Sequence, residues 1–335
     1  MSATAAATVS NATVEVRNLQ THFFTRAGVV KAVDDVSFSV SAGKVMGLVG
    51  ESGSGKSVTG FSIIGLVDPP GRVAGGQILF KGRDLATLPE AEMRGLRGNR
   101  IAMIFQDPMM TLNPVLRIDT QMIETVLAHE KVSREEARQR SRDALGQVGI
   151  PSPDERLKSY PHQFSGGMRQ RVAIAIALLH KPDLIVADEP TTALDVTIQG
   201  QILAEAQKLC ADFGTALIWI THDLSVVAGL ADDIAVMYAG KVVESGPVEQ
   251  VLDAPLHPYT LGLIGSVPSR NRRGEPLRQI PGMTPSLLNL PAGCAFRARC
   301  PRAEARCAEP PPMAEYRPGR FARCIHPHDE EAVAA

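Results

Sequence analysis

A glycine-rich stretch in the first fifth of the chain has the residue types that bind phosphate. It follows the pattern G-x-x-x-x-G-K-[ST] and comprises Gly50, Glu51, Ser52, Gly53, Ser54, Gly55, Lys56 and Ser57. The glycines allow successive backbone N–H groups to curl around an anion, and a following helix adds the positive end of its dipole. Lys56 is expected to reach the β- and γ-phosphates of a nucleotide, and Ser57 to ligate Mg²⁺. The alternative is a flexible glycine turn, which the position between a strand and a helix disfavours.

Two adjacent carboxylates end an apolar run further along the chain. Residues 184–187 read Leu-Ile-Val-Ala, and Asp188 and Glu189 follow them. Asp188 is expected to hold Mg²⁺, directly or through water, and Glu189 to polarise an attacking water. Because an aliphatic strand ending in Asp-Glu is common and mostly structural, the pair takes its meaning from the loop at Gly50.

A serine followed by two glycines lies shortly before these carboxylates. Ser165 can cap a helix, and Gly166 and Gly167 leave its first turn without side chains, so that backbone N–H groups could approach a phosphate. The apolar residues of this helix recur with a period of 3.6 and are Met168, Val172, Ile176 and Leu179. An ordinary capped helix is the alternative.

The combination of these stretches resembles the ATP-binding subunits of ABC transporters. The signature of that family is usually written L-S-G-G-Q, and this chain departs from it with Phe164 and Met168. In that family the signature contacts the γ-phosphate of ATP held by the partner subunit. The resemblance therefore implies that Ser165, Gly166 and Gly167 act on a nucleotide in a second protomer, and that a chain with one phosphate loop must dimerise.

Three further residues match this family by their order along the chain. Gln106, within Ile-Phe-Gln-Asp-Pro, resembles the Q-loop glutamine, which senses Mg²⁺ and the attacking water. Asp195, within Thr-Ala-Leu-Asp, resembles the D-loop aspartate at the dimer contact. His222, within Ile-Thr-His-Asp, resembles the switch histidine, which would bond the γ-phosphate and orient Glu189.

An aromatic residue before the phosphate loop completes the resemblance. Phe23 lies where the family places an aromatic ring that stacks on adenine. Phe24 is adjacent and could take the same role.

Four of the five cysteines gather near the C-terminus and are Cys294, Cys300, Cys307 and Cys324. The fifth, Cys210, lies apart and is expected to be a small apolar core residue. In a chain without an export signal disulfides are disfavoured, and neighbouring thiolates suggest a metal or a cluster. The spacings lack the C-x-x-C pairs typical of structural zinc, which weakens zinc but leaves it open.

Residues 293–301 resemble the C-terminal extension of dipeptide and oligopeptide transporter ATPases, as do residues 107–114 and 255–260. In that family the four cysteines are associated with a [4Fe–4S] cluster, so the resemblance implies such a cluster, with Zn²⁺ as the alternative. His326 and His328 could be spare ligands, and exposed tail histidines are the simpler interpretation.

The resemblance implies an importer ATPase that couples ATP hydrolysis to the uptake of di- and oligopeptides. Its implied partners are a homologous second ATPase subunit, two transmembrane permease subunits and an extracytoplasmic solute-binding protein, with the chain at the cytoplasmic face of the membrane. Import of nickel or another small solute is an alternative within the same fold. A soluble ABC ATPase acting on ribosomes or DNA repair is a further alternative. A regulator without catalysis is opposed by Glu189 and His222.

Composition limits the remaining classes of function. The formal net charge of −1 and the pI near 6.7 leave no basic surplus for a phosphate backbone, which argues against nucleic-acid binding. The first residues lack the basic start and apolar core of a signal peptide. The longest aliphatic run, residues 172–179, is far shorter than the roughly 20 residues that cross a bilayer. Any membrane association is therefore expected to go through partners.

The elements that must position these residues follow from hydrophobic period. Strands are expected at residues 14–16, 36–40, 45–49, 77–80, 184–187, 216–220 and 234–238. A buried helix is expected at residues 58–66, and helical periodicity prevails from about 111 to 180, where Ser133 and Glu136 form a capping box.

This order predicts an α/β fold of the P-loop NTPase class and of the ABC type. It combines a mostly parallel core sheet, an antiparallel β subdomain, a helical signature subdomain and a small Cys-rich C-terminal extension. The expected boundaries are a loose tail at 1–11, an ATPase domain at 12–254 with its helical part at about 108–178, and the extension at 255–335.

Overall fold

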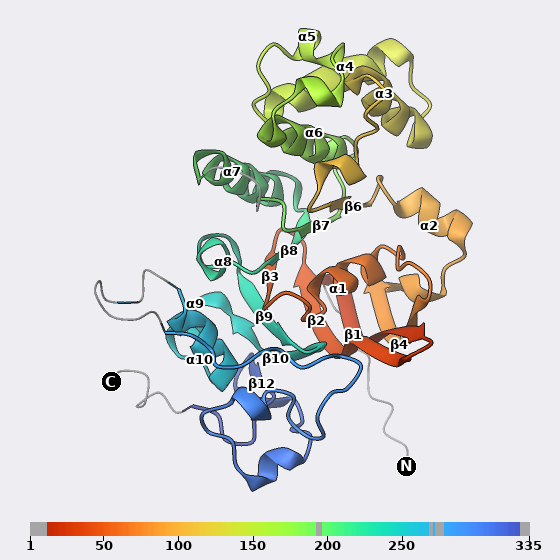
Figure 1. The fold of residues 1–335 in the computed structure, drawn as a ribbon. Helices are drawn as coiled ribbons and strands as arrows, with labels where there is room; N and C mark the ends of the chain where they lie inside the picture. The colour runs from red at the N-terminus through yellow and green to blue at the C-terminus, as the bar shows by residue number, and fades with distance from the viewer. Residues whose placement is uncertain (1–11, 192–195, 268–270, 272–277, 329–335) are drawn as a thin grey trace, which may run out of the picture.

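Two β-sheets and a lobe of helices make up the computed structural model of this chain, which describes residues 12–191, 196–267, 271 and 278–328 (Figure 1). The expected tail at 1–11 lies outside the described residues. In the described part, no helix has the length and apolar character needed to cross a membrane.

The larger sheet has eight strands in the order β11-β12-β10-β9-β3-β8-β7-β6. Five neighbouring strands, β9, β3, β8, β7 and β6, are parallel, and the remaining pairs are antiparallel. The parallel strands are almost entirely apolar and buried, as expected where both faces of a sheet are covered. Its members are β3 (Val45–Val49), β6 (Ile101–Ile104), β7 (Leu184–Asp188), β8 (Ala216–Thr221), β9 (Asp233–Tyr238), β10 (Lys241–Pro247), β11 (Ala314–Arg317) and β12 (Arg320–Ala322). The predicted mostly parallel core sheet is confirmed.

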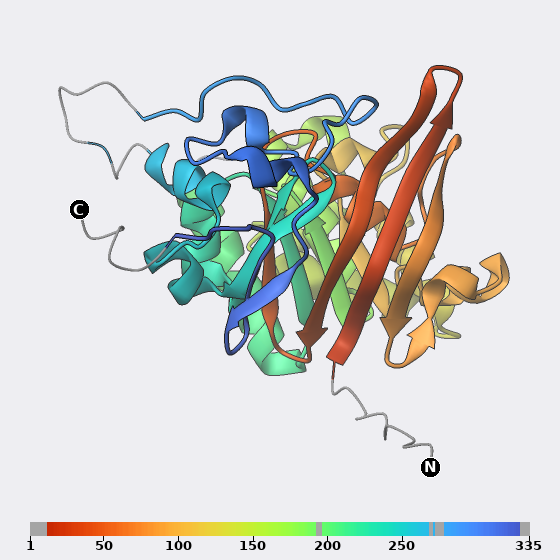
Figure 2. The ribbon, with the colours of Figure 1, turned by 90° about the horizontal axis from the view of Figure 1, so that it is seen from below.

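The smaller sheet is antiparallel, in the order β2-β1-β4-β5. Its strands are β1 (Ala12–Thr25), β2 (Gly28–Ser41), β4 (Gly71–Phe80) and β5 (Arg83–Asp84). Figure 2 shows β1 and β2 as a long hairpin beside the core. Both strands are longer than their apolar runs predict, because backbone pairing continues through polar residues and past several register shifts.

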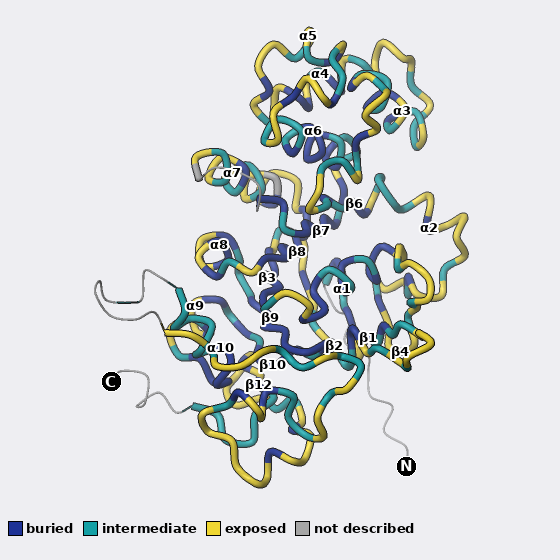
Figure 3. Tube along the Cα trace, viewed as in Figure 1, coloured by how far each residue is buried: buried dark blue, intermediate teal, exposed yellow. Residues whose placement is uncertain are grey.

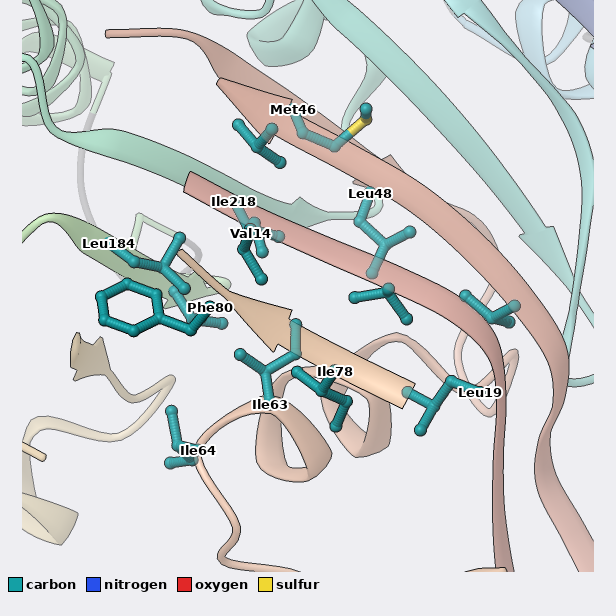
Figure 4. Close-up of a cluster of buried hydrophobic side chains, with 14 of the residues drawn as sticks. Val14, Leu19, Met46, Leu48, Ile63, Ile64, Ile78, Phe80, Leu184 and Ile218 are labelled. Carbon is teal, nitrogen blue, oxygen red and sulfur yellow. The ribbon is translucent and has the colours of Figure 1, made fainter. Parts of the chain in front are cut away.

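The core between the two sheets is aliphatic (Figure 4). Val14 and Ile78 from the smaller sheet pack in one buried cluster with Leu48 and Ile218 from the larger sheet. Ile63 of α1 (Lys56–Ile63) belongs to the same cluster. The helix that follows the glycine-rich loop is therefore fixed by burial on both sides.

Helices α3 (Ile118–His129), α4 (Arg134–Gln147), α5 (Pro153–Leu157) and α6 (Gly166–Leu178) form a separate lobe at the top of Figure 1. Its inner side is buried, as the dark segments of Figure 3 show, and Leu145 and Val172 belong to its own apolar cluster. The predicted cap of α4 is present, since the Ser133 hydroxyl accepts a hydrogen bond of 3.1 Å from the Glu136 N–H.

Further α-helices and 3-10 turns complete the part of the chain that the structure describes. They are α2 (Glu90–Leu96), α7 (Val196–Phe213), α8 (Leu224–Leu230), α9 (Val248–Asp253) and α10 (Pro258–Gly265), with 3-10 turns at η1 (Leu85–Thr87), η2 (Pro108–Met110), η3 (Pro161–Gln163), η5 (Arg297–Arg299) and η6 (Ala305–Ala308). Helix α8 approaches β3 so closely that a Cβ on Gly47 would lie 2.4 Å from Cγ1 of Val227.

The C-terminal residues extend the larger sheet. Strand β12 pairs with β10, placing Glu244 opposite Ala322. Glu244 and Arg320 form an ion pair of 2.9 Å in which both side chains are almost completely buried. Arg320 also donates to the carbonyl oxygens of Gln250 and Ala254, each over 2.8 Å. The hairpin β11–β12 is thus attached to the sheet by strand pairing and by one buried cation.

Candidate nucleotide site

The glycine-rich loop connects β3 to α1 and requires glycine at two positions. Gly50 has a φ of +151°, and a Cβ there would lie 2.2 Å from the carbonyl oxygen of Met237. Gly55 has a φ of +104°, and its Cβ would lie 2.3 Å from the carbonyl oxygen of Ala32. Ser54 Oγ is buried without a hydrogen-bond partner among the described residues. The loop therefore offers bare backbone to a ligand, as a phosphate cradle requires.

Lys56 folds back over this loop. Its Nζ donates to the carbonyl oxygens of Gly50 at 2.8 Å and Glu51 at 3.0 Å. Burial lowers the pKa of Lys56, and the carboxylates of Glu189, Asp188 and Glu51 act in the opposite direction. The ammonium is held where it can exchange these carbonyls for phosphate oxygens.

Ser57 and Asp188 meet although they lie far apart in the sequence. The Ser57 hydroxyl donates to Asp188 Oδ1 over 3.0 Å. Burial raises the pKa of Asp188, and the hydrogen bond from Ser57 acts against that shift. Hydroxyl and carboxylate oxygens are the ligands that Mg²⁺ takes beside nucleotide phosphates, so this pair fits the ion.

Glu189 is the centre of a second group of polar side chains. Its Oε1 lies 3.1 Å from Nδ1 of His222, and its Oε2 accepts a hydrogen bond of 3.3 Å from Nε2 of Gln106. The three residues follow β7, β8 and β6, whose carboxyl ends lie at one edge of the sheet. Glu189 has a φ of +44°, and its N–H donates to the Ile220 carbonyl oxygen over 2.9 Å. A left-handed backbone at a non-glycine residue is costly and is held here by the neighbouring strand.

The serine–glycine–glycine stretch begins α6, as predicted. Ser165 Oγ accepts a hydrogen bond of 3.3 Å from the Met168 N–H, and Phe164 is buried beside it. Ser165 and Gly166 are exposed, and a Cβ on Gly166 would meet no atom within 4 Å. Because α6 belongs to the upper lobe, the stretch lies away from α1 of the same chain (Figure 1).

The connection from β6 to the helical lobe lies between the polar group at Glu189 and the serine–glycine–glycine stretch that begins α6. Gln106, Gly166 and Pro190 line one cavity of about 200 Å³. Ser165, Gly166 and Gly167 make no hydrogen bond to residues 50–57 within the part of the chain that the structure describes. One chain thus assembles Gln106, Glu189 and His222, but it does not cover its own phosphate loop with its own serine–glycine stretch.

The structure describes the two aromatic residues that were candidates for adenine stacking, but not the D-loop aspartate. A Cβ on Gly71 would lie 2.6 Å from Cε1 of Phe23, so that this ring packs closely on β4. Phe24 is 40% exposed, and the Arg72 guanidinium lies 4.4 Å from its ring centroid. Asp195 lies outside the described residues.

The prediction of an iron–sulfur cluster is wrong. Cys294, Cys300, Cys307 and Cys324 are free thiols that line one small cavity, and Cys307 Sγ lies 3.6 Å from Nε2 of His326. However, within the described ranges no group of three or more His, Cys, Asp or Glu side chains is arranged to hold a metal ion. The same finding leaves the zinc alternative without a site.

Three of these thiols are shifted towards their protonated form. Burial raises the pKa of Cys294 and Cys300, and it raises the pKa of Cys324 to about 11. Metals bind the thiolate, and burial among apolar groups favours the protonated thiol. Cys210 belongs to an apolar core cluster, as predicted, and its pKa is also raised to about 11 by burial.

Sequence patterns missed the residues that contact the second position of the phosphate loop. Tyr259, Thr284 and Arg299 all bond to Glu51. Tyr259 and Arg299 lie in residues 255–260 and 293–301, which were singled out by family resemblance, but that resemblance does not indicate where a distant segment will pack.

The fold and the site define a nucleotide-binding cassette of the ABC transporter type. The ABC transporter family matches residues 33–192, and the family described as the C-terminal region of oligopeptide/dipeptide transporters matches residues 243–307. The dimeric structure of the bacterial ABC transporter cassette MJ0796 superposes with a TM-score of 0.64 at 26% identity. That likeness covers 70% of this chain and 98% of the cassette. The same cassette in a post-hydrolysis state bound to ADP and Pi gives the same score.

Curated relatives give the particular branch. The oligopeptide transport ATP-binding protein OppD of Escherichia coli (strain K12) is 49% identical over 321 residues, covering 96% of this chain and 95% of that protein. The dipeptide transport ATP-binding protein DppD of Bacillus subtilis (strain 168) is 52% identical over 295 residues, covering 88% of each. The chain therefore belongs to the ATP-binding subunits of oligopeptide and dipeptide ABC transporters, as its sequence predicted.

Proposed function

We propose that this chain hydrolyses ATP at an interface between two ATPase subunits and couples that reaction to the uptake of di- and oligopeptides. The observation that carries the proposal is the triad of Glu189, His222 and Gln106 beside the pair of Ser57 and Asp188. A carboxylate held by two polar side chains next to a phosphate cradle suits the activation of water for attack on a γ-phosphate.

Each part of the loop has a role in binding. The backbone N–H groups of residues 50–57 and the Lys56 ammonium hold the phosphates, while Ser57, Asp188 and Gln106 are placed for Mg²⁺. When bound, Mg²⁺ supplies charge neutralisation at the β- and γ-phosphates. Phe23 is proposed to stack on adenine.

Glu189 acts on the water that attacks the γ-phosphate. Its carboxylate accepts a hydrogen bond from that water and increases its nucleophilicity. His222 orients Glu189 and contacts the γ-phosphate. When the γ-phosphate is released, His222 loses that contact. Gln106 lies between this site and the helical lobe, and it is placed to transmit the nucleotide state to a bound membrane subunit.

A second ATPase subunit completes the site. Ser165, Gly166 and Gly167 are proposed to contact the γ-phosphate held by the partner, and Asp195 to lie at the dimer contact. The exposed α6 N-terminus, which does not reach its own loop, supports this arrangement. Closure of the dimer brings hydrogen-bond donors from both subunits around the transferred phosphoryl group. After cleavage these contacts to the phosphoryl group are lost, and the dimer reopens.

The complete transporter is proposed to contain a homologous but distinct second ATPase, two transmembrane permease subunits and an extracytoplasmic solute-binding protein. The chain would lie at the cytoplasmic face of the membrane, with residues 12–254 as the ATPase domain, 108–178 as its helical part and 255–335 as the extension. The names of the curated relatives support peptides as the solute.

Uptake of labelled di- and tripeptides into proteoliposomes containing the assembled transporter tests this function. We expect uptake that requires ATP and stops when Glu189→Gln replaces the wild-type chain. Peptide uptake that proceeds without ATP, or ATP-driven uptake of nickel with no response to peptides, would refute the proposal.

A further inference from the structure

Glu51, the second residue of the phosphate loop, is bonded to the C-terminal part of the chain. Arg299 donates through Nη1 to Oε2 at 2.7 Å and through Nη2 to Oε1 at 2.9 Å, although 248 residues separate the two. The Thr284 hydroxyl donates to Oε2 at 2.7 Å, and the Tyr259 hydroxyl accepts from the Glu51 N–H at 2.9 Å. Both the carboxylate and the backbone of this loop residue are therefore held by residues beyond the ATPase core.

Arg299 is itself fixed in place. Its side chain is only 6% exposed, and its Nε donates to the Pro281 carbonyl oxygen at 2.8 Å. The guanidinium carbon lies 5.8 Å from the centroid of the Tyr238 ring and 5.9 Å from that of Phe296. A guanidinium that forms a two-pronged bond to a carboxylate and packs on aromatic rings has little freedom to leave. The extension thus presents a rigid cation to the loop.

The charge of Glu51 explains why such a cation matters. Hydrogen bonding by Arg299 lowers the pKa of Glu51, so this carboxylate is ionised at neutral pH. A negative charge within a loop that binds phosphates opposes binding unless a cation offsets it. Lys56 cannot serve both purposes, because its ammonium is needed for the phosphates. The arginine satisfies the carboxylate and leaves the lysine available.

We propose that Arg299 is a positioning residue for nucleotide binding, which holds and neutralises Glu51 so that the phosphate loop keeps its shape and its positive potential. This inference rests on the proposed function, since it assumes that residues 50–57 bind ATP. It makes the C-terminal extension a structural part of the nucleotide site, in which Tyr259 and Thr284 assist the arginine.

The test uses the full-length chain and equilibrium binding of the fluorescent analogue mant-ATP with Mg²⁺. Arg299→Ala is expected to raise the Kd about tenfold, the loss that corresponds to one charge-assisted hydrogen bond. Arg299→Lys should recover part of the affinity, because it restores the charge without the two-pronged geometry. Arg297→Ala, at an exposed arginine on the same 3-10 turn, is the matched control and should bind as wild type does.

A second substitution separates charge neutralisation from a general structural role. Glu51→Gln added to Arg299→Ala removes the uncompensated carboxylate, so the double variant should bind mant-ATP more tightly than Arg299→Ala alone. If Arg299 only supported the fold, the second substitution would bring no recovery. Thr284→Val removes one bond to the same carboxylate and should weaken binding less than Arg299→Ala does.

In the assembled transporter, Arg299→Ala should raise the KM for ATP and leave kcat within about twofold, because the loop binds ground state and transition state alike. A Kd for Arg299→Ala equal to that of Arg297→Ala would overturn the inference, as would a double variant that binds mant-ATP no more tightly than Arg299→Ala. Wild-type protein that does not bind mant-ATP would instead refute the proposed function.

Discussion

Nδ1 of His222 lies 3.1 Å from Oε1 of Glu189, while Nε2 of Gln106 donates to the other carboxylate oxygen over 3.3 Å. The side chain of Glu189 is 16% exposed, whereas that of His222 is 57% exposed. The carboxylate is thus largely enclosed and the imidazole faces outwards, where a phosphate or a partner can reach it. This arrangement is the basis of the first prediction.

Glu189→Gln should keep ATP binding and lower kcat by at least about 100-fold, because the amide cannot act as a base. The variant should also accumulate a closed dimer with ATP, detectable by size-exclusion chromatography. Glu124→Gln changes an exposed carboxylate on α3 and is the control. ATPase activity near wild type in Glu189→Gln would refute the assignment of the general base.

Lys56→Ala should weaken nucleotide binding itself. The substitution removes an ammonium that is buried over the loop, and about 10- to 100-fold loss in mant-ATP affinity is expected for one charged hydrogen-bonding group. Lys208→Ala alters an exposed lysine on α7 and should have no effect. Unchanged affinity with lowered kcat would show that Lys56 acts only in the transition state.

Gly166→Asp should abolish turnover without unfolding the chain. A Cβ at Gly166 meets no atom within 4 Å, so the folded protomer has room for the new side chain. At a dimer interface the carboxylate would repel the partner's γ-phosphate. The melting temperature and the chain's own mant-ATP affinity should stay at wild-type values while ATPase activity of the assembled pair is lost.

Gly95→Asp is the matched control for that experiment, since a Cβ on Gly95 of α2 also meets no atom within 4 Å. Full ATPase activity in Gly166→Asp would exclude a role for this stretch in the partner's site. So would a specific ATPase activity that stays constant as the protein is diluted below the dimerisation range.

His257 should make the fold less stable in mild acid. Complete burial lowers its pKa to about 3, from 6.5. Between these values the unfolded state binds a proton that the folded state excludes, so the free energy of unfolding falls as pH drops below 6.5. At pH 5 the loss from this group is about 2 kcal/mol.

Urea unfolding of the full chain at pH 7.5 and pH 5.0 measures this loss. In the wild type, His257 Nδ1 accepts a hydrogen bond of 3.0 Å from the Tyr259 N–H. His257→Gln can keep an acceptor for this N–H, and it should lose less stability between the two pH values than the wild type does. His162→Gln, at an exposed histidine, should retain the full loss. Equal losses in wild type and His257→Gln would contradict the buried neutral state.

Much of the fold and of the nucleotide site could be predicted from local patterns. The turn at residues 50–57 depends on glycine conformations, and the cap of α6 depends on Ser165 and the next turn, so both are decided within a few residues. Parallel strands were visible as apolar runs because both faces of their sheet are buried. Strands β1 and β2 were predicted too short, because cross-strand pairing sets their length and their polar residues give no signal.

What the amino-acid order determined by itself is the chemistry of the phosphate loop, the carboxylates after β7 and the family resemblance. The tertiary structure decided which distant groups meet. Four cysteines near one another in sequence predicted a cluster, yet they remain free thiols without the arrangement of a metal site among the described residues. Conversely, nothing local linked Glu51 to Arg299, and their ion pair exists because the extension packs against the loop. Neighbouring residues determine local conformation, whereas a contact between residues 248 positions apart depends on how the whole chain is packed.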